Sequence, residues 1–504
     1  MRKINKTKRL LCAVLAVAVS IGFAGCGQKE KASDDGKVLL RWIMPGVGKQ
    51  TDSDKVWAEF NNKLKTYEGM ENVTVEFEVI ANSDYKQKVM LMQTGGTQMD
   101  IMGTYTLNYA DEVRNETFLD VTDMMDEYAP DIKNSMPEWA LEMTQVDGRQ
   151  YVIPNYQQMA MPMWSPSFHA DNAEKYLDAA KLEEAMHASD ILSAAELDLY
   201  DEYLTKLKEN GVLNLGIYPG STWAMKGYAE IASGGYVYRL NSDKIEIQHT
   251  FELDTIKMLA EKQAEWFKKG FIRKDVLSAE KSKGTYDITH ENYNKYIERQ
   301  KNSKAKRPYK IIPSQTKYYL PTYSTAGGNG VTTYSKNPEK ALMLLNLMYS
   351  EKGKDLYRLL AYGIEGEHYK KISDTRIETL CYSGTQPQSD SAYGLNKWLV
   401  GNTALAYETQ ADPEGWNDYV FNDWNANAVP SKLTGITIDL DPIDTEITQV
   451  KSVYSEYINQ ITSGAMTDLD ATYKEAMAKL EAAGNSKVKQ YLQEQVDKFL
   501  AENK

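Results

Sequence analysis

The sequence contains few of the side chains that most often carry out catalysis. Its 504 residues include only 3 cysteines and 5 histidines. The histidines show neither HExxH spacing nor an i,i+4 pair, and no G-x-S-x-G or GxxxxGK[ST] motif occurs. The acidic clusters at 439–446 and 468–470 lack the glycine and the ligand spacing of an EF-hand loop. We therefore expect no catalytic residue, no metal site and no cofactor, with a calcium site built from other carboxylates as an open alternative.

Positive charge is also scarce. Lys and Arg number 58 against 71 Asp and Glu, which gives a formal net charge of −13. Residues 1–9 contain Arg and Lys but no acid, so the remainder of the chain is more acidic still. An acidic surface repels phosphate backbones and anionic membranes. We therefore do not expect nucleic acid or an anionic membrane surface as a partner.

The apolar run of residues 10–25 falls short of the roughly 18–20 residues that a membrane-spanning helix needs. A basic start, an apolar centre and small residues before a cut are typical of a secretory signal. Phe23-Ala24-Gly25-Cys26 resembles the lipobox of bacterial lipoproteins, although Phe23 replaces the usual leucine. The resemblance implies that residues 1–25 are removed and that Cys26 carries the lipid, with an ordinary secretory signal as the alternative. Residues 26–36 then form a flexible tether, which predicts a protein anchored by lipid alone on the outer face of the cytoplasmic membrane.

Strands and helices alternate along the first part of the chain. Residues 38–44 and 73–80 have the apolar patterns of strands, and 51–68 carries apolar residues on one helical face. A further helix is predicted at 83–96 and a strand at 99–105, and this order favours a parallel sheet in a three-layer α/β domain. Residues 157–320 repeat the theme with more helix. Cys381 is the single cysteine left after Cys12 and Cys26, so no disulfide is expected.

Several segments carry a resemblance that covers the predicted mature chain: RWIMPG, MDIMGTYT, GRQYVIPNYQQ, TAGGNGV and the stretch that ends in GIEGEHY (363–369). The chain resembles family 1 extracellular solute-binding proteins, the receptor components of bacterial ABC importers for sugars, and GIEGEHY resembles a signature of one lipoprotein subfamily. The resemblance implies a periplasmic-binding-protein-like α/β fold, with two lobes around a central cleft, a multi-crossing hinge and a helical C-terminal region. We expect lobe 1 to comprise 37–154 and about 325–375, lobe 2 to comprise 155–324 and about 376–450, and helices of 451–504 to pack on the lobes. GIEGEHY itself is expected to be a turn that determines the fold.

A sugar site needs flat aromatic platforms for the C–H faces of the rings and planar polar groups for the hydroxyls. The composition suits this need, with 34 Tyr and 9 Trp against 10 Phe. Candidates follow predicted strands or lie at predicted crossings between lobes, and each has a structural alternative as a turn, hinge or core residue. The candidate ligand-binding residues are Lys49, Gln50, Tyr105, Thr106, Asn155, Tyr156, Gln157, Trp164, Trp223, Tyr236 and Asn329.

The resemblance implies a monomeric receptor that captures an oligosaccharide and passes it to an ABC permease with a cytoplasmic ATPase. One alternative is the same fold binding a peptide or a charged glycan. Another is a lipid-anchored glycoside hydrolase, for which the sequence singles out no pair of carboxylates. A sensor subunit that feeds a membrane kinase is a third alternative.

Overall fold

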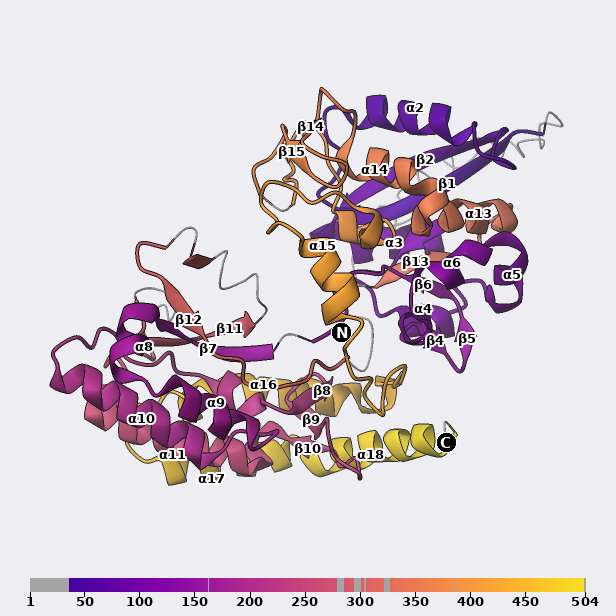
Figure 1. Ribbon diagram of the computed structural model, residues 1–504. Helices are drawn as coiled ribbons and strands as arrows, with labels where there is room; N and C mark the ends of the chain where they lie inside the picture. Colours follow the sequence, from indigo (N-terminus) through magenta and orange to yellow (C-terminus); the bar gives the residue numbers. More distant parts are fainter. Residues whose placement is uncertain are drawn as a thin grey trace, which may run out of the picture.

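The computed structural model describes residues 36–161, 163–278, 285–293, 301–302, 305–320, 327–384 and 386–502. The predicted signal, Cys26 and the tether up to residue 35 lie outside these ranges. The chain forms two lobes, lobe 1 above lobe 2 in Figure 1, and each has its own large cluster of buried apolar side chains. This arrangement confirms the predicted fold class. Within the described ranges, no helix combines the length and the apolar character needed to cross a bilayer.

Lobe 1 is built on a five-stranded sheet in the order β2-β1-β3-β13-β6. β1 pairs in parallel with β2 and β3, whereas β13 is antiparallel to both β3 and β6. In β2, alternate residues are buried because one face of this edge strand packs on the core. Because β13 is antiparallel to both β3 and β6, strands β1, β3 and β6 run in the same direction and end at the same edge of the sheet. The chain leaves for lobe 2 from this edge. The strands are β1 (Val38–Gly46), β2 (Val73–Ala81), β3 (Ile101–Gly103), β6 (Val152–Pro154) and β13 (Gly328–Val331).

Helices cover both faces of this sheet. One face carries the larger core, with α2, α13 and α14, and the other carries a smaller core, with α3 and α4. The remaining elements surround these layers. The lobe 1 helices and short strands are α2 (Ser53–Leu64), α3 (Asn82–Thr94), α4 (Tyr109–Arg114), α5 (Met125–Tyr128), α6 (Pro130–Ser135), α7 (Glu138–Glu142), β4 (Gln145–Val146), β5 (Arg149–Gln150), α13 (Pro338–Tyr349), α14 (Lys354–Tyr362), β14 (Tyr369–Lys371), β15 (Ile377–Thr379), η5 (Lys397–Leu399), α15 (Trp416–Tyr419) and the π-helical turn η7 (Val420–Trp424).

The GIEGEHY segment ties the end of α14 to the start of α2. Gly363 ends α14 at φ +83, and the His368 ring occupies the space that a Cβ at this glycine would need. His368 accepts a hydrogen bond at Nδ1 from the Ile364 amide (2.9 Å) and donates from Nε2 to the Asp52 carboxylate (3.1 Å). The motif therefore has the structural role that the sequence predicted.

Lobe 2 has two small sheets, β11-β7-β12 and β10-β9-β8, and every strand pairing within them is antiparallel. This lobe departs from the parallel theme that the sequence predicted. In the sheet β10-β9-β8, a tight hairpin turn makes β8 and β9 antiparallel. Gly234 and Gly235 form this turn, and both adopt the positive φ that such hairpins require. The lobe 2 elements are β7 (Met163–His169), α8 (Ala170–Tyr176), α9 (Ala179–His187), α10 (Ala194–Glu209), η2 (Ser221–Met225), β8 (Tyr228–Ala232), β9 (Tyr236–Arg239), β10 (Gln248–His249), η3 (Thr250–Glu252), α11 (Asp254–Lys269), β11 (Ile288–Tyr293), β12 (Tyr309–Ile311), η8 (Asp441–Ile443), α16 (Asp444–Ile461), α17 (Leu469–Ala482) and α18 (Asn485–Glu502).

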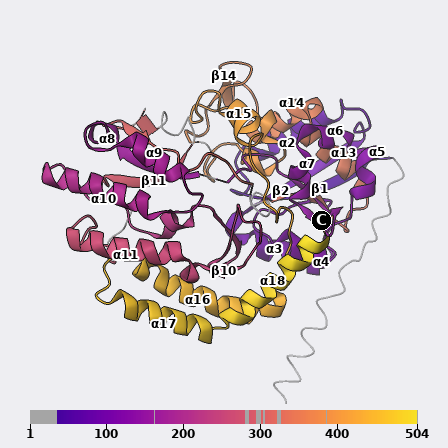
Figure 2. The same ribbon diagram turned by 60° about the horizontal axis from the view of Figure 1, so that its bottom comes forward.

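The late part of the chain divides between the lobes differently from the prediction. Ile377, Tyr407 and Trp424 are buried in the lobe 1 core, so residues 377–424 pack with lobe 1 and not with lobe 2. The Tyr407 ring packs against Tyr362 at the end of α14, with ring centroids 5.7 Å apart, a contact that sequence order alone does not reveal. From Leu433 onward the buried side chains belong to the lobe 2 core. Figure 2 shows α16, α17 and α18 together along the outer side of lobe 2.

Three segments of the chain join the lobes and hydrogen-bond to one another. The first crossing follows β6, the middle crossing precedes β13, and the last crossing follows η7. Asn425 is buried in the last crossing, and its Oδ1 accepts from the amides of Met159 (2.9 Å) and Ala160 (3.1 Å) in the first crossing. Its Nδ2 donates to the Gln157 carbonyl (2.6 Å). Val429 in the last crossing pairs with the middle crossing, because its amide donates to the Tyr318 carbonyl (2.8 Å) and its carbonyl accepts from the Leu320 amide (2.9 Å). This is the multi-crossing hinge that the sequence predicted.

Candidate functional site

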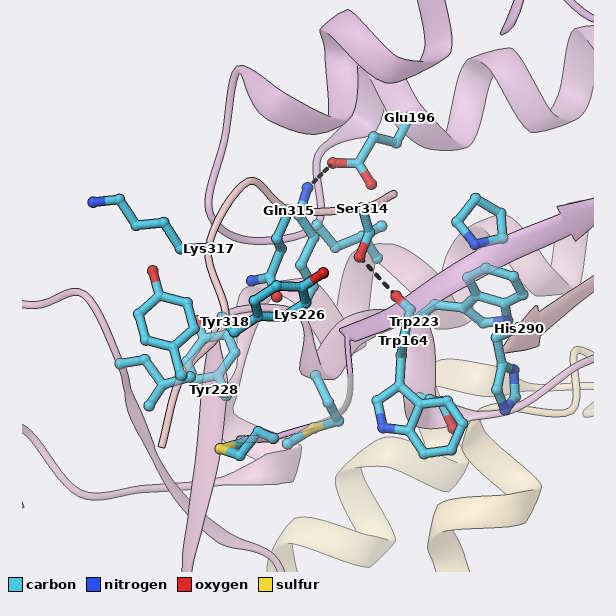
Figure 3. Close-up of a pocket in the computed structure, with 18 of the residues that line it drawn as sticks. Trp164, Glu196, Trp223, Lys226, Tyr228, His290, Ser314, Gln315, Lys317 and Tyr318 are labelled. Atoms are coloured by element: carbon cyan, nitrogen blue, oxygen red, sulfur yellow. Dashed lines mark hydrogen bonds and ion pairs between the residues drawn. The ribbon is translucent and has the colours of Figure 1, made fainter. Parts of the chain in front are cut away.

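A cavity of about 260 Å³ opens in lobe 2 beside the hinge, and we call it the lobe 2 cavity (Figure 3). Its walls come from the start of β7, from η2 and β8, from β11, and from the middle crossing at 314–319. Both aromatic rings and polar side chains line it, a combination that suits a carbohydrate ligand. The lining residues labelled in Figure 3 are Trp164, Glu196, Trp223, Lys226, Tyr228, His290, Ser314, Gln315, Lys317 and Tyr318.

An aromatic group is assembled around His290 on one wall. The rings of Trp164, Tyr218 and Trp223 each meet the imidazole edge to face, with centroids 5.2, 5.3 and 5.4 Å away. Burial lowers the pKa of His290, so this ring is neutral at pH 7. Trp223 is nearly buried and donates its indole N–H to the Tyr218 carbonyl (3.1 Å), whereas Trp164 is 46% exposed. Trp164 therefore has an aromatic surface left for a ligand.

Hydrogen bonds from the middle crossing fix the backbone at Trp164. The Ser314 hydroxyl donates to the Trp164 carbonyl (2.8 Å), and the Ser314 amide donates to the Ser165 hydroxyl (3.1 Å). These bonds join the start of β7 to the hinge. The platform is thus held in place by the segment that connects the two lobes.

The deep wall of the cavity contains an ion pair, which we call the floor pair, between Glu196 on α10 and Lys226 before β8. The Lys226 ammonium lies 2.6 Å from Glu196 Oε1. The Lys226 side chain is 6% exposed and the Glu196 side chain is 2% exposed. Lys226 also donates to the Met186 carbonyl (2.6 Å). Burial raises the pKa of Glu196 to about 7 and lowers the pKa of Lys226, while the attraction between the two groups opposes both shifts.

A second cavity, of about 510 Å³, lies between the lobes, and we call it the inter-lobe cavity. Lobe 1 contributes residues 104–105 and 107–110 after β3 together with Gly327, and lobe 2 contributes 231–233, 436–438 and Leu440. Tyr105 is 37% exposed here and meets the Trp398 ring edge to face at 4.6 Å. Arg114 of α4 lies 3.7 Å from the Asp439 carboxylate of lobe 2, so charges also face each other between the lobes.

Three of the predicted site residues line these cavities. Trp164 and Trp223 line the lobe 2 cavity, and Tyr105 lines the inter-lobe cavity. Thr106 follows Tyr105 directly, and its hydroxyl is buried without a hydrogen-bond partner among the described residues. Gln157 lies in the first crossing, where its carbonyl accepts from Asn425.

Two polar candidates, Asn155 and Asn329, are instead buried at the edge of the lobe 1 sheet, where they hydrogen-bond to other protein groups. Asn329 is fully buried: its Oδ1 accepts from the Trp42 indole (3.1 Å) and its Nδ2 donates to Asn155 (2.9 Å) and to the Leu399 carbonyl (3.1 Å). Tyr349 donates its hydroxyl proton to Asn155 as well (2.7 Å). Asn155 and Asn329 therefore hold the edge of the sheet together, and both side-chain polar atoms of Asn329 are already engaged within the protein.

Four further candidates also have structural roles or lie outside both cavities. Gln50 is buried and bridges the Gln388 carbonyl and the Gly394 amide. Tyr156 is buried against Trp139 and Phe421, and Tyr236 is buried in lobe 2 with its hydroxyl on Asn485 (3.2 Å). Lys49 pairs with Asp54 (2.7 Å) on the surface of lobe 1. The partners of Gln50, Tyr156 and Tyr236 are remote in sequence, so the structural roles of these three residues are visible only in the fold.

The sequence analysis missed the floor pair, His290 and the cavity-lining role of residues 314–319. Glu196 follows Ser193 in a Ser-x-x-Glu pattern, and Ser193 caps α10 by accepting from the Glu196 amide. That pattern predicts a helix start but gives no sign that the carboxylate faces a cavity. Among the described residues, no group of three or more His, Cys, Asp and Glu side chains is arranged to hold a metal ion.

Comparison with known proteins points to one fold over the length of the chain. A curated protein of Streptococcus pneumoniae, named carbohydrate ABC transporter substrate-binding protein, is 22% identical over 99% of this chain and 100% of its own length. The crystal structure of N-glycan transport solute binding protein (NgtS) from Streptococcus pneumoniae matches 93% of this chain and 100% of its own, with a TM-score of 0.70 and 20% identity. The chain has the fold of the solute-binding proteins.

Two further comparisons refine this result. NgtS structures whose titles name bound Man1GlcNAc and Man5GlcNAc match with TM-scores of 0.60 and 0.57, each covering 100% of its own chain and 92% and 93% of this one. Residues 432–501 match a domain of unknown function, DUF3502. In this structure those residues form α16, α17, α18 and the wall of the inter-lobe cavity around 436–440, so they are an integral part of lobe 2.

Proposed function

We propose that this protein is the extracellular receptor of a bacterial ABC importer and that it captures an oligosaccharide. The observation that carries the proposal is the lobe 2 cavity, where an exposed tryptophan, neutral His290 and the floor pair lie beside a three-segment hinge. Flat rings suit the apolar faces of sugars, and buried polar groups suit their hydroxyls. The names of the relatives support the same class of ligand.

Capture works through the hinge. A ligand held by the lobe 2 cavity that also contacts lobe 1 favours the arrangement in which the lobes are closer, and only this difference in affinity can shift the equilibrium. The protein acts as a monomer, and a permease with a cytoplasmic ATPase accepts the sugar from the closed form.

The anchor and the absence of catalysis complete the proposal. Cys26 carries the lipid and residues 26–36 keep the two lobes near the permease on the outer face of the cytoplasmic membrane. The protein has no catalytic residue and needs no cofactor, so the sugar leaves it chemically unchanged. Both parts rest on the sequence and on the similarity to binding proteins.

A thermal-shift screen with product analysis tests the function. The purified protein is mixed with neutral oligosaccharides that include Man5GlcNAc, with acidic oligosaccharides and with short peptides. A ligand at 100 times its Kd stabilises the folded state by about 2.7 kcal/mol. We expect a neutral oligosaccharide to raise the Tm and to be recovered intact. A shift with peptides alone, or a sugar that is cleaved during the assay, would contradict the proposal.

A further inference from the structure

We propose that the lobe 2 cavity takes a single terminal ring of a neutral oligosaccharide and that the floor pair, Glu196 and Lys226, binds two neighbouring hydroxyls of that ring. This inference rests on the proposed function and deepens it, because it states which part of the sugar is recognised and excludes a charged ring.

The size of the cavity limits the ligand to one ring. Cavities that enclose whole drug-sized ligands measure about 300–1,000 Å³, and the lobe 2 cavity measures about 260 Å³. Its walls all come from lobe 2 and from the crossing segments, so it is a pocket within one lobe. A pocket of this size accepts the end of a chain, while the rest of the oligosaccharide extends toward the gap between the lobes.

The floor pair offers one donor and one acceptor side by side. An ammonium group has three protons, and two of those on Lys226 are used by Glu196 and by the Met186 carbonyl. The Glu196 carboxylate accepts the hydrogen bond from Lys226 at Oε1, so Oε2 is left to accept a hydrogen bond from a ligand. A hydroxyl group both donates and accepts, so two neighbouring hydroxyls complete both sets of hydrogen bonds.

The charges that line the cavity cancel. Besides the floor pair, the lining contains the exposed side chains of Glu230 and Lys317, again one of each sign. Burial keeps His290 neutral at pH 7. A ring that carries a carboxylate or sulfate would bring a second negative charge to Glu196, and a ring with an amine would bring a second positive charge to Lys226. Both arrangements are costly where water is largely excluded, so a ring without charge fits best.

Trp164 completes the recognition at the mouth. Ser314 hydrogen-bonds the backbone carbonyl of Trp164, and the exposed indole meets His290 edge to face, so one ring face is oriented before any ligand arrives. A sugar that enters with its hydroxyls toward the floor pair presents an apolar C–H face to the wall. The aromatic wall and the charged floor therefore recognise different parts of the same ring.

A double variant, Glu196→Gln with Lys226→Met, removes the charged partners without leaving one of them buried alone. We expect the Kd for the neutral oligosaccharide found in the screen to rise at least tenfold, with a Tm close to that of the wild type. The matched control is Glu252→Gln with Lys489→Met, which makes the same two changes in another lobe 2 ion pair (2.6 Å) outside both cavities. Its Kd should equal that of the wild type.

A second measurement needs no variant and so does not depend on folding. The wild type is titrated with two oligosaccharides that differ only at the terminal ring, where the CH₂OH group of one is oxidised to a carboxylate in the other. We expect the neutral ligand to bind at least tenfold more tightly. Equal or tighter binding of the oxidised ligand, or a double variant that binds within twofold of the wild type, would overturn the inference and leave the proposed function standing. Failure of every oligosaccharide in the screen to bind the wild type would overturn the proposed function itself, and this inference with it.

Discussion

The two lobes use similar polar and aromatic residues for different purposes. At the strand-end edge of lobe 1, Asn155 and Asn329 are buried and bind each other, Trp42 and Tyr349. At the hinge side of lobe 2, Trp164 and the floor pair face a cavity. The difference shows that a polar residue after a strand belongs to a ligand site only if the hinge does not already satisfy it. Buried hydrogen-bonding groups must find partners somewhere, and in lobe 1 they find them in the protein.

The largest effect is expected at Asn329 in lobe 1. Asn329→Ala leaves the buried Trp42 indole N–H without its acceptor and removes one of the two hydrogen bonds to Asn155 Oδ1, which should lower the free energy of unfolding by about 3 kcal/mol. Denaturant titration measures the loss. Under conditions in which the variant is folded, its Kd for sugar should match that of the wild type. A stable variant with weakened binding would place Asn329 in the ligand site after all.

A pH effect of similar size is expected in lobe 2. His249 is buried, donates from Nε2 to the Gly234 carbonyl (2.8 Å) and accepts at Nδ1 from the Phe251 amide (3.1 Å). Burial lowers its pKa to about 4. In the unfolded chain this histidine has an ordinary pKa near 6.5, so the unfolded chain takes up a proton first as the pH falls. The stabilisation is therefore complete above pH 6.5, and the free energy of unfolding falls by about 3 kcal/mol as the pH drops to 4.

Comparison with His249→Gln isolates this contribution. Glu196 acts in the opposite direction, because its raised pKa of about 7 means that stability from this group falls as the pH rises from about 4.5 to 7. The Tm of both proteins is measured between pH 4 and 7. The loss of Tm on acidification should be smaller in the variant, and an identical profile would contradict the role of His249.

Trp164 should affect binding much more than stability. Trp164→Ala removes a half-exposed ring, so the free energy of unfolding should change by less than about 1 kcal/mol, whereas the Kd for sugar should rise roughly tenfold or more. Calorimetric titration measures the binding. Leu91→Ala is the control, since Leu91 is an exposed apolar residue on α3 outside both cavities. Equal Kd values for the two variants would remove Trp164 from the site.

The smallest effect is expected at the charges that face each other between the lobes. Arg114→Gln removes a 3.7 Å contact with Asp439, and partly exposed pairs contribute only about 0–1 kcal/mol. We expect the Kd to change by less than fivefold and the change to shrink further in high salt. A large, salt-independent change would show that this contact controls the lobes more strongly than its geometry suggests.

The sequence predicted the features that depend on local pattern. Periodicity, caps and resemblance predict the strands and helices of residues 38–105, the turn at GIEGEHY and the two-lobe fold. The antiparallel pairing in lobe 2 and the packing of 377–424 on lobe 1 depend on contacts between distant segments, as the hydrogen bonds of Asn425 illustrate. Among the site residues, Trp223 was found because it follows a predicted strand and a Pro-Gly turn, and Trp164 was proposed as an aromatic platform with the core as its alternative. Glu196 and Lys226 were not, since a charged residue in a helical or polar segment looks the same whether it faces water or a cavity.

The most direct test of the receptor function is X-ray solution scattering of the protein with and without the oligosaccharide that gives the largest thermal shift. The account predicts that the sugar lowers the radius of gyration, because the two lobes close around a ligand held in the lobe 2 cavity. A radius of gyration that stays unchanged while the sugar saturates the protein would contradict closure and with it the proposed role as an importer's receptor.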